Sequence, residues 1–153
     1  MANDNAPGQI VISGESNAVD QVVEGAKAAG LRRVIKLPVS APFHCGLMAP
    51  AAEVMRDALA ASKVFDAMMP IFCNVTAEAE TLAEKLRTNL VKQVTERVRW
   101  RESLLAIRGA GCNVYVELGT GKVLSGLVKR TLENVIIANL ETPADLDSVL
   151  AEL

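Results

Sequence analysis

The longest uncharged stretch of the chain, residues 37–52, is apolar but is broken by Pro38, Pro42, Gly46 and Pro50. Proline lacks a backbone N–H and its ring clashes with the preceding helical turn, so this stretch cannot form one regular helix. It therefore cannot cross a lipid bilayer as a helix either. The sequence predicts an apolar loop here, which is unusual because loops normally face water and carry polar residues.

Patterns typical of strands and helices alternate on both sides of this loop. We predict strands at 9–14, 33–39, 69–75, 113–118 and 135–138, and helices at 16–29, 51–62, 78–95, 100–108, 123–132 and 146–153. The first three of these elements would form a β-α-β unit. Strands that alternate with helices indicate an α/β fold with parallel strands. Glu78, Glu80 and Glu84 would then form a solvated face at the start of the helix over 78–95.

Composition excludes several classes of function. Half of the 153 residues are hydrophobic, which excludes a disordered chain, while 3% aromatic residues and a net charge of -2 argue against nucleic-acid binding. Cys45, Cys73 and Cys112 are widely separated, which argues against a disulfide framework or a metal site and favours a reducing cytosol. The first residues lack the features of a signal peptide. We therefore expect a cytoplasmic globular protein with no membrane and no nucleic-acid partner.

The turn Gly119-Thr-Gly121-Lys122 has the glycines of a phosphate-binding loop but not its spacing. A P-loop needs glycine where Val116 stands and Ser or Thr where Val123 stands, and a dinucleotide fingerprint needs glycine at Leu124. We interpret the glycines as a sharp turn between a strand and a helix.

His44, the single histidine of the chain, lies inside the proline-rich loop. A lone histidine is commonly a surface or core residue, but a stiff apolar loop could also hold a general base at fixed geometry. Such a base needs a nucleophile. Neighbouring side chains diverge, which disfavours Cys45, whereas Ser13 and Ser40 stay open as partners. No Gly-x-Ser-x-Gly elbow occurs, and the nearest segment, 14–18, lacks the final glycine.

Several motifs occur in a fixed order along the chain: Asn3-x-Asn5-x-Pro7-Gly8-Gln9, Pro38-Val-Ser-Ala-Pro-Phe-His44-x-x-Leu47-Met48, Leu90-Val-x-Gln93, Val98-x-Trp100 and Glu117-x-Gly119-x-Gly121-Lys122-Val123-Leu124. Together they resemble the C-terminal half of the malonyl-CoA:acyl carrier protein transacylases of bacterial type II fatty acid synthesis. The resemblance covers essentially the whole chain.

The resemblance implies a fold in two parts. Residues 1–38 would be the end of a ferredoxin-like small subdomain, including its terminal β-α-β portion. Residues 39–153 would be the C-terminal part of an α/β-hydrolase-like large subdomain.

The resemblance also implies a chemistry. In this family a serine takes malonyl from malonyl-CoA and passes it to the phosphopantetheine thiol of acyl carrier protein, and no cofactor is needed. His44 matches the histidine base, and Gln93 falls where a backbone carbonyl orients that base. Phe43 resembles a bulky residue that excludes α-methyl substituents, and Asn5 matches an asparagine near the active cleft.

The family's serine elbow, its carboxylate-binding arginine and its oxyanion-hole residues belong to the N-terminal half. A base without its nucleophile cannot run this chemistry. We therefore expect a fragment that is inactive alone and that dimerises, aggregates or depends on the missing half as its partner. The alternative is a non-catalytic module that binds acyl carrier protein or a partner subunit.

Overall fold

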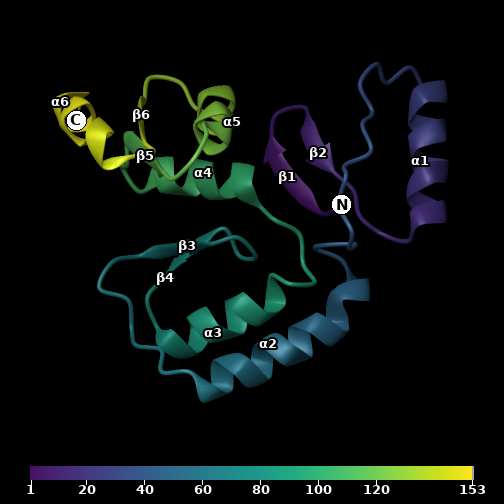
Figure 1. The fold of residues 1–153 in the computed structure, drawn as a ribbon, viewed down its shortest axis with the longest axis horizontal. Helices are drawn as coiled ribbons and strands as arrows, with labels where there is room; N and C mark the ends of the chain where they lie inside the picture. The colour runs from purple at the N-terminus through teal and green to yellow at the C-terminus, as the bar shows by residue number, and fades with distance from the viewer. Residues whose placement is uncertain (153) are drawn as a thin grey trace.

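The computed structural model describes residues 1–152, with six helices, two short 3₁₀ turns and three two-stranded sheets in this part of the chain (Figure 1). The strands are β1 (Asn3–Ala6), β2 (Gln9–Val11), β3 (Ile71–Cys73), β4 (Glu78–Glu80), β5 (Val114–Leu118) and β6 (Ile136–Leu140). The helices are α1 (Ser16–Ala28), α2 (Ala49–Ala61), α3 (Ala83–Lys92), α4 (Trp100–Gly109), α5 (Val123–Thr131) and α6 (Leu146–Glu152), with 3₁₀ turns at Gly46–Met48 and Pro143–Asp145. This is a mixed α/β fold. Leu153, the end of the last predicted helix, lies outside the described residues.

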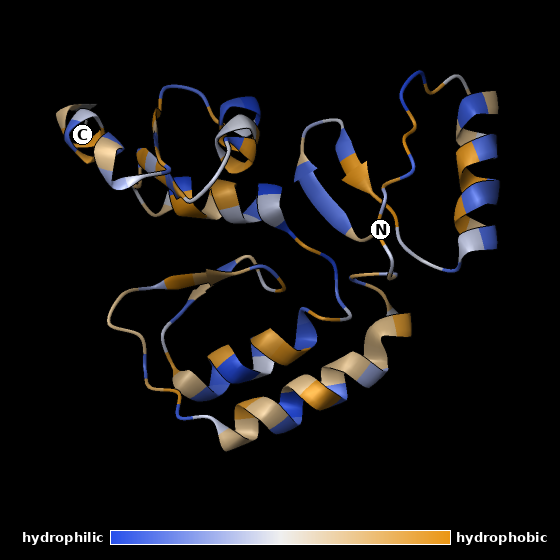
Figure 2. Ribbon diagram, viewed as in Figure 1, coloured by the Kyte–Doolittle hydropathy of each residue, from blue (hydrophilic) through white to orange (hydrophobic). Residues whose placement is uncertain are grey.

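The chain begins with an antiparallel hairpin, β1–β2, that the sequence predicted only in part. The turn between the strands contains Gly8, whose φ of 72° suits glycine. The predicted strand over 9–14 is confirmed for Gln9–Val11, but β1 was missed because its Asn3-Asp4-Asn5 sequence is poor in strand-forming residues. Figure 2 shows the contrast between a hydrophilic β1 and a hydrophobic β2.

Helix α1 is confirmed, but the predicted strand over 33–39 is wrong, and with it the β-α-β unit. A strand needs a neighbouring strand to pair its backbone groups. Within the described chain no strand pairs with this segment, and its one internal backbone bond joins Val39 N to Leu37 O at 2.9 Å. Its side chains Ile35, Leu37 and Val39 are exposed.

The predicted helix over 78–95 is confirmed only for Ala83–Lys92, and its start is wrong because Glu78–Glu80 pairs with Ile71–Cys73 as the antiparallel hairpin β3–β4. The Glu80 carboxylate then accepts hydrogen bonds from the amides of Thr81 and Leu82, both at 2.9 Å. These bonds, with the Leu82 amide foremost, lower the pKa of Glu80. Helix α3 therefore begins at Ala83, whose amide is bound by Asp66 Oδ1 at 2.8 Å. Glu80 thus has a structural role and is not part of a purely solvated face.

The C-terminal third follows the predicted pattern. Strands β5 and β6 are parallel, with Val114 opposite Ile136 and Leu118 opposite Leu140. Helices α4 and α5 pack on one face around a core of Leu104, Val128 and Leu132, with Trp100, Tyr115, Val135 and Ile137 against it. Alternation turns Val114, Val116, Leu118 and Ile136 to the opposite face, where they are exposed.

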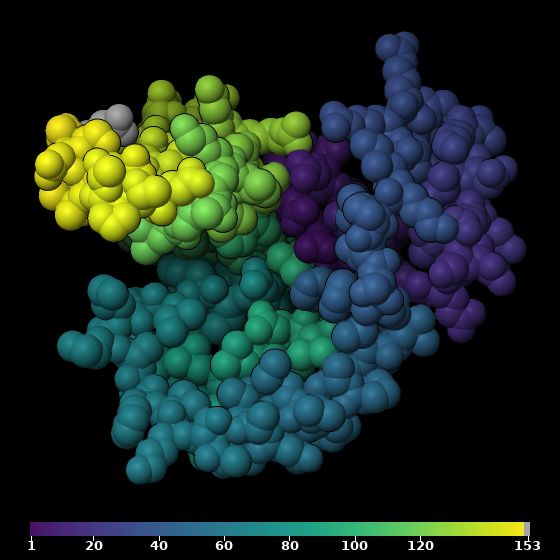
Figure 3. Space-filling view, viewed as in Figure 1, coloured from purple at the N-terminus to yellow at the C-terminus, as the bar shows by residue number. Residues whose placement is uncertain are grey.

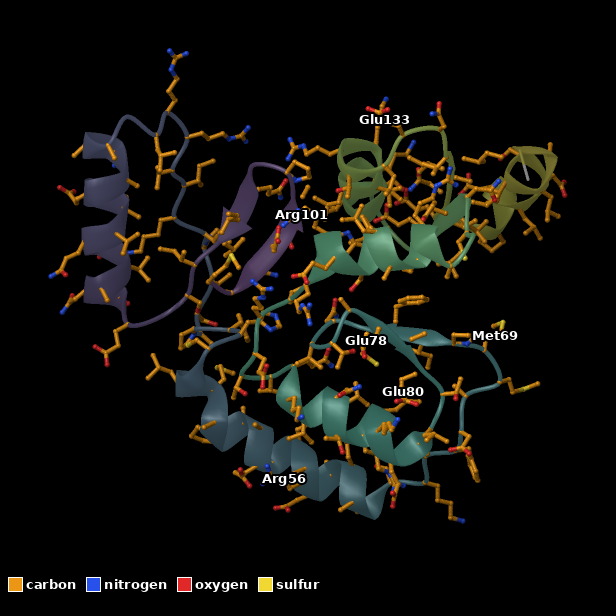
Figure 4. All side chains as sticks on the ribbon, turned by 180° about the vertical axis from the view of Figure 1, so that it is seen from behind. Arg56, Met69, Glu78, Glu80, Arg101 and Glu133 are labelled. Carbon is orange, nitrogen blue, oxygen red and sulfur yellow. The ribbon has the colours of Figure 1, made fainter. Side chains whose placement is uncertain are left out.

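Exposed apolar side chains also gather on the loop before β3, namely Phe65, Met68 and Met69, of which Figure 4 labels Met69. Contiguous apolar surface of this kind commonly marks a site of contact with further protein. No helix within residues 1–152 is both long enough and apolar enough to cross a membrane.

A short segment, residues 97–102, joins the separate hairpins and helices. The Val98 amide donates to Ala2 O at 2.7 Å and the Asp4 amide donates to Val98 O at 2.9 Å. Arg99 Nη1 donates to Thr76 O at 2.8 Å in the β3–β4 turn, and its guanidinium pairs with Glu102. We refer to residues 97–102 as the arginine segment.

Arg101, within this segment, binds a buried carboxylate on β1. Its Nε lies 2.9 Å from Asp4 Oδ1 and its Nη2 lies 2.7 Å from Oδ2, while Asp4 is only 6% exposed. Figure 4 shows Arg101 beside the β1–β2 hairpin, and Figure 3 shows that hairpin packed between the C-terminal elements and the loop that follows α1. The Arg101 hydrogen bonds hold the pKa of the Asp4 carboxyl below its usual value of 3.8, although burial opposes them.

This ion pair predicts a pH-dependent stability. Because the pKa of Asp4 is lowered by folding, its contribution is complete above the usual pKa and is lost as the pH falls through the folded-state pKa. At pH 7, Asp4→Asn should lower the thermal midpoint by an amount on the order of several degrees, and this difference should shrink towards pH 3. Thermal unfolding of both proteins across that range, followed by circular dichroism, measures the effect.

Glu53→Gln is the matched control, because Glu53 pairs with Arg56 on an exposed face of α2. Exposed pairs of this kind contribute little, so its midpoint should stay close to that of the parent chain. A constant difference between Asp4→Asn and the parent at all pH values would contradict the prediction.

Candidate functional site

His44 lies in a tight turn between the extended chain after α1 and the 3₁₀ turn that leads into α2. Its φ of 59° is in the left-handed region, which residues other than glycine seldom adopt. Such strain persists only where surrounding contacts hold it, and it concentrates at functional sites. The side chain is half-buried.

The imidazole of His44 meets the end of α3. Its Nδ1 lies 2.9 Å from the backbone carbonyl oxygen of Gln93. Gln93 caps the C-terminus of α3, where the last carbonyl groups have no partner within the helix. A helix end thus supplies a free acceptor to a histidine 49 residues away in the sequence.

This contact determines which ring nitrogen carries the proton in the neutral imidazole. A carbonyl oxygen can only accept a hydrogen bond, so Nδ1 must be the donor. The lone pair then lies on Nε2, the nitrogen that is available to take a proton from another group. The arrangement is that of a base held by one nitrogen and free at the other.

The other two predicted site residues, Phe43 and Asn5, make no hydrogen bond to His44 or Gln93 within the described residues. Phe43 precedes His44 and is 48% exposed. Asn5 lies on β1 and is half-buried, and no hydrogen bond of the described residues joins its side chain to His44 or Gln93. The structure therefore brings together His44 and Gln93, whereas the roles of Phe43 and Asn5 stay predictions.

None of the candidate nucleophiles of this chain bonds to His44 within the described residues. Cys45 Sγ donates to the carbonyl of Pro42 at 3.1 Å, as expected for a neighbouring side chain that diverges from the imidazole. The hydrogen bonds of the described residues include none between His44 and either Ser13 or Ser40. The described residues also contain no group of three or more His, Cys, Asp or Glu side chains that could hold a metal ion.

The glycine-rich turn after β5 is structural, as predicted. Gly119 and Gly121 have φ values of 114° and 87°. The amides at the start of α5 are bound by the protein itself, since Glu117 accepts from Leu124 N at 3.0 Å and from Ser125 N at 2.7 Å. The Ser125 side chain foremost, together with these two amide bonds, lowers the pKa of Glu117. An internal carboxylate thus occupies the position that a bound phosphate would take.

Sequence reasoning missed Asp4 and Arg101. Asp4 stands in a polar run that did not predict a strand, and a partner 97 residues away leaves no local pattern. The one signal in the sequence is that Asp4, an acidic residue, lies between Ala2 and Ala6, which are small and apolar.

Comparison with solved structures defines the class of protein. The acyl-carrier-protein S-malonyltransferase from Bartonella henselae superposes with a TM-score of 0.94 at 43% identity, and the match covers 99% of this chain and 48% of that one. A malonyl-transacylase in complex with its type II PKS acyl-carrier protein gives a TM-score of 0.92 at 38% identity, covering 99% of this chain and 49% of that one. The chain thus has the mixed α/β fold of one part of these acyltransferases.

Comparison with curated sequences is more specific. The malonyl CoA-acyl carrier protein transacylase of Bacillus subtilis is 42% identical over 145 residues, which are 93% of this chain and 46% of that protein. No protein-family model matches. The chain is therefore homologous to malonyl CoA-acyl carrier protein transacylases over nearly its whole length, and it spans about half the length of the curated relatives that it matches.

The geometry of His44 predicts a tautomer that nuclear magnetic resonance can read. Because Nδ1 donates to Gln93 O, the neutral imidazole should carry its proton on Nδ1, and Nε2 should show the ¹⁵N shift of an unprotonated nitrogen. His44 is the single histidine, so the signals need no assignment. Gln93→Ala keeps the backbone carbonyl and should leave this tautomer unchanged. A neutral imidazole protonated on Nε2 would contradict the assignment.

Proposed function

We propose that this chain supplies the histidine base of a malonyl-CoA:acyl carrier protein transacylase and corresponds to the C-terminal half of that enzyme. The observation that carries the proposal is the contact of His44 Nδ1 with the Gln93 carbonyl, which leaves Nε2 free. Homology to transacylases over nearly the whole chain supports it. Gln93 acts through its backbone, as a positioning residue for the base.

The proposed reaction has two half-reactions. In the first, His44 Nε2 takes the proton of a serine hydroxyl as the serine oxygen attacks the malonyl thioester carbon, and the C–S bond to CoA breaks. The CoA sulfur leaves with the proton from the imidazolium. In the second, Nε2 takes the proton of the phosphopantetheine thiol as its sulfur attacks the acyl-serine carbon, the C–O bond to serine breaks, and the serine oxygen takes the proton from the imidazolium. The serine belongs to the half of the fold outside this chain.

The imidazole of His44 faces the C-terminal end of α3. This position suits a group that gains positive charge during the reaction. Peptide dipoles leave partial negative charge at a helix C-terminus. The Gln93 carbonyl therefore faces the imidazole at the moment when it becomes positive. A fixed acceptor of this kind also holds the ring in one orientation, which is the main requirement of a general base.

Partners and substrate follow from the same proposal. A homologous malonyl-transacylase has been solved in complex with an acyl-carrier protein, which supports such a carrier as acceptor here. Malonyl-CoA is the donor, and the thioester already activates the acyl group, so the reaction needs no cofactor.

We also propose a cytoplasmic location, which suits the three free cysteines. The small subdomain would end near residue 38 and the large one resume from residue 39.

The test of the base is His44→Ala in the complete transacylase. Malonyl transfer from malonyl-CoA to acyl carrier protein should fall by about 10²–10⁴-fold, because general-base catalysis contributes on that order. Arg56→Met, on the exposed face of α2, is the control and should transfer malonyl at the parent rate. Unchanged transfer by His44→Ala would refute the proposal.

The same assay separates this proposal from a binding-only module. The chain alone should be inactive, and activity should appear when it is mixed with the N-terminal half. Activity of the chain alone would mean that it carries its own nucleophile. Binding of acyl carrier protein without transfer, even in the mixture, would favour the non-catalytic module.

Phe43 is proposed as a substrate-binding residue beside the base, where its ring would crowd an α-methyl group, and Asn5 as a residue lining the same cleft. Phe43→Ala should raise the kcat/KM for methylmalonyl-CoA relative to malonyl-CoA by about 10-fold, the discrimination typical of a single methyl group. Phe43→Leu is the matched control, since it retains most of the bulk and should retain most of the selectivity. An unchanged ratio in Phe43→Ala would remove Phe43 from the substrate site.

A further inference from the structure

The turn that carries His44 is strained, and its backbone closes it only weakly. The left-handed φ of 59° at His44 costs free energy that neighbouring contacts must supply. Backbone hydrogen bonds close the adjacent turns, from Phe43 N to Ala41 O and from Met48 N to Cys45 O, both at 3.0 Å. Residues 43 and 44 form a turn, but no well-aligned backbone hydrogen bond within the described residues joins Cys45 N to Pro42 O across His44.

A side chain reinforces the closure of this turn. Cys45 Sγ donates to the carbonyl oxygen of Pro42 at 3.1 Å, three residues back along the chain. In an ordinary β-turn the amide of the fourth residue bonds to the carbonyl of the first. Here the thiol of the fourth residue reaches the same acceptor, so that Phe43 and His44 are the two central residues of the closed turn.

Both ends of this turn are anchored. The ring of Pro42 restricts its own φ. Cys45 is extended, with φ of -146° and ψ of 171°, and directly precedes the 3₁₀ turn Gly46–Met48 that leads into α2. The thiol bond therefore connects a stiff residue before His44 to the start of a helix after it.

We propose that Cys45 is a positioning residue for the base: its thiol, bound to the Pro42 carbonyl, keeps the turn closed and so aims Nε2 of His44. This inference rests on the proposed function of His44. Two contacts then determine where Nε2 lies. The Gln93 carbonyl sets the rotation of the ring, and the Cys45 thiol sets the backbone that carries it.

The geometry disfavours a nucleophilic role for the same thiol. Cys45 Sγ is engaged with a backbone carbonyl, and the imidazole of the adjacent residue is engaged with Gln93. A thiol that donates to a carbonyl is not activated by a base. Cys45 therefore acts on the chemistry through His44.

The test compares three substitutions of Cys45 in the complete transacylase, with kcat and KM for malonyl-CoA measured for each. Cys45→Ser keeps a donor and should keep kcat within about threefold of the parent. Cys45→Ala removes the donor and should lower kcat by about 10- to 100-fold with little change in KM, because a small displacement of a catalytic group has that cost. Cys45→Val also lacks a donor but fills the space and suits the extended backbone, so it keeps the test valid if Cys45→Ala fails to fold.

A double substitution separates positioning from a general structural role. If Cys45 acts through His44, adding Cys45→Ala to His44→Ala should cause no further loss of kcat. Three outcomes would each overturn the inference. They are equal losses of kcat in Cys45→Ser and Cys45→Ala, full activity in both Cys45→Ala and Cys45→Val, and a further loss of kcat in the double variant. Full activity in His44→Ala would refute the proposed function itself, so the two failures are distinguishable.

Discussion

The pair between Arg101 and Asp4 is the contact on which the assembly of this chain depends. Asp4 is buried, and an unpaired carboxylate at that position would be costly, so β1 can pack against α4 and α5 only with the guanidinium in place. The neighbouring residues of the arginine segment bind the β1–β2 hairpin through Val98 and the β3–β4 turn through Arg99. A segment of six residues thus holds together the β1–β2 hairpin, the β3–β4 turn and the start of α4, which share no sheet.

The candidate site depends on where a different helix ends. Helix α3 ends at Lys92 with Gln93 as its C-cap, and this end supplies the carbonyl that meets the imidazole. Glu80 and Asp66 bind the amides that precede and open the same helix, so it begins at Ala83 and leaves Glu78–Glu80 to form β4. The hydrogen bond to His44 therefore depends on the end of α3 as well as on the loop that carries the histidine.

The local sequence pattern was sufficient to predict a helix or strand whose partners are close in the sequence. The helices α1, α2, α4 and α5 and the parallel pair β5–β6 were predicted because their apolar spacing and their turns are local signals. The strand over 33–39 failed for the opposite reason: apolar β-rich residues indicate a strand, but only a neighbouring strand makes one. At the site, His44 stood out as the single histidine, and Gln93 came from the resemblance alone. The thiol bond of Cys45 has no sequence signal, since it depends on a turn whose conformation is visible only in three dimensions.

The large sequence separation between Arg101 and Asp4 also affects how the chain folds during synthesis. Asp4 leaves the ribosome 97 residues before its partner. At an elongation rate of about 5–20 residues per second, the β1–β2 hairpin waits roughly 5–20 s with a carboxylate that will later be buried and that does not yet have its arginine. Synthesis of Arg101 in α4 ends that interval. The order of synthesis thus makes β1 one of the last strands to be secured, although it is made before β3, β4, β5 and β6.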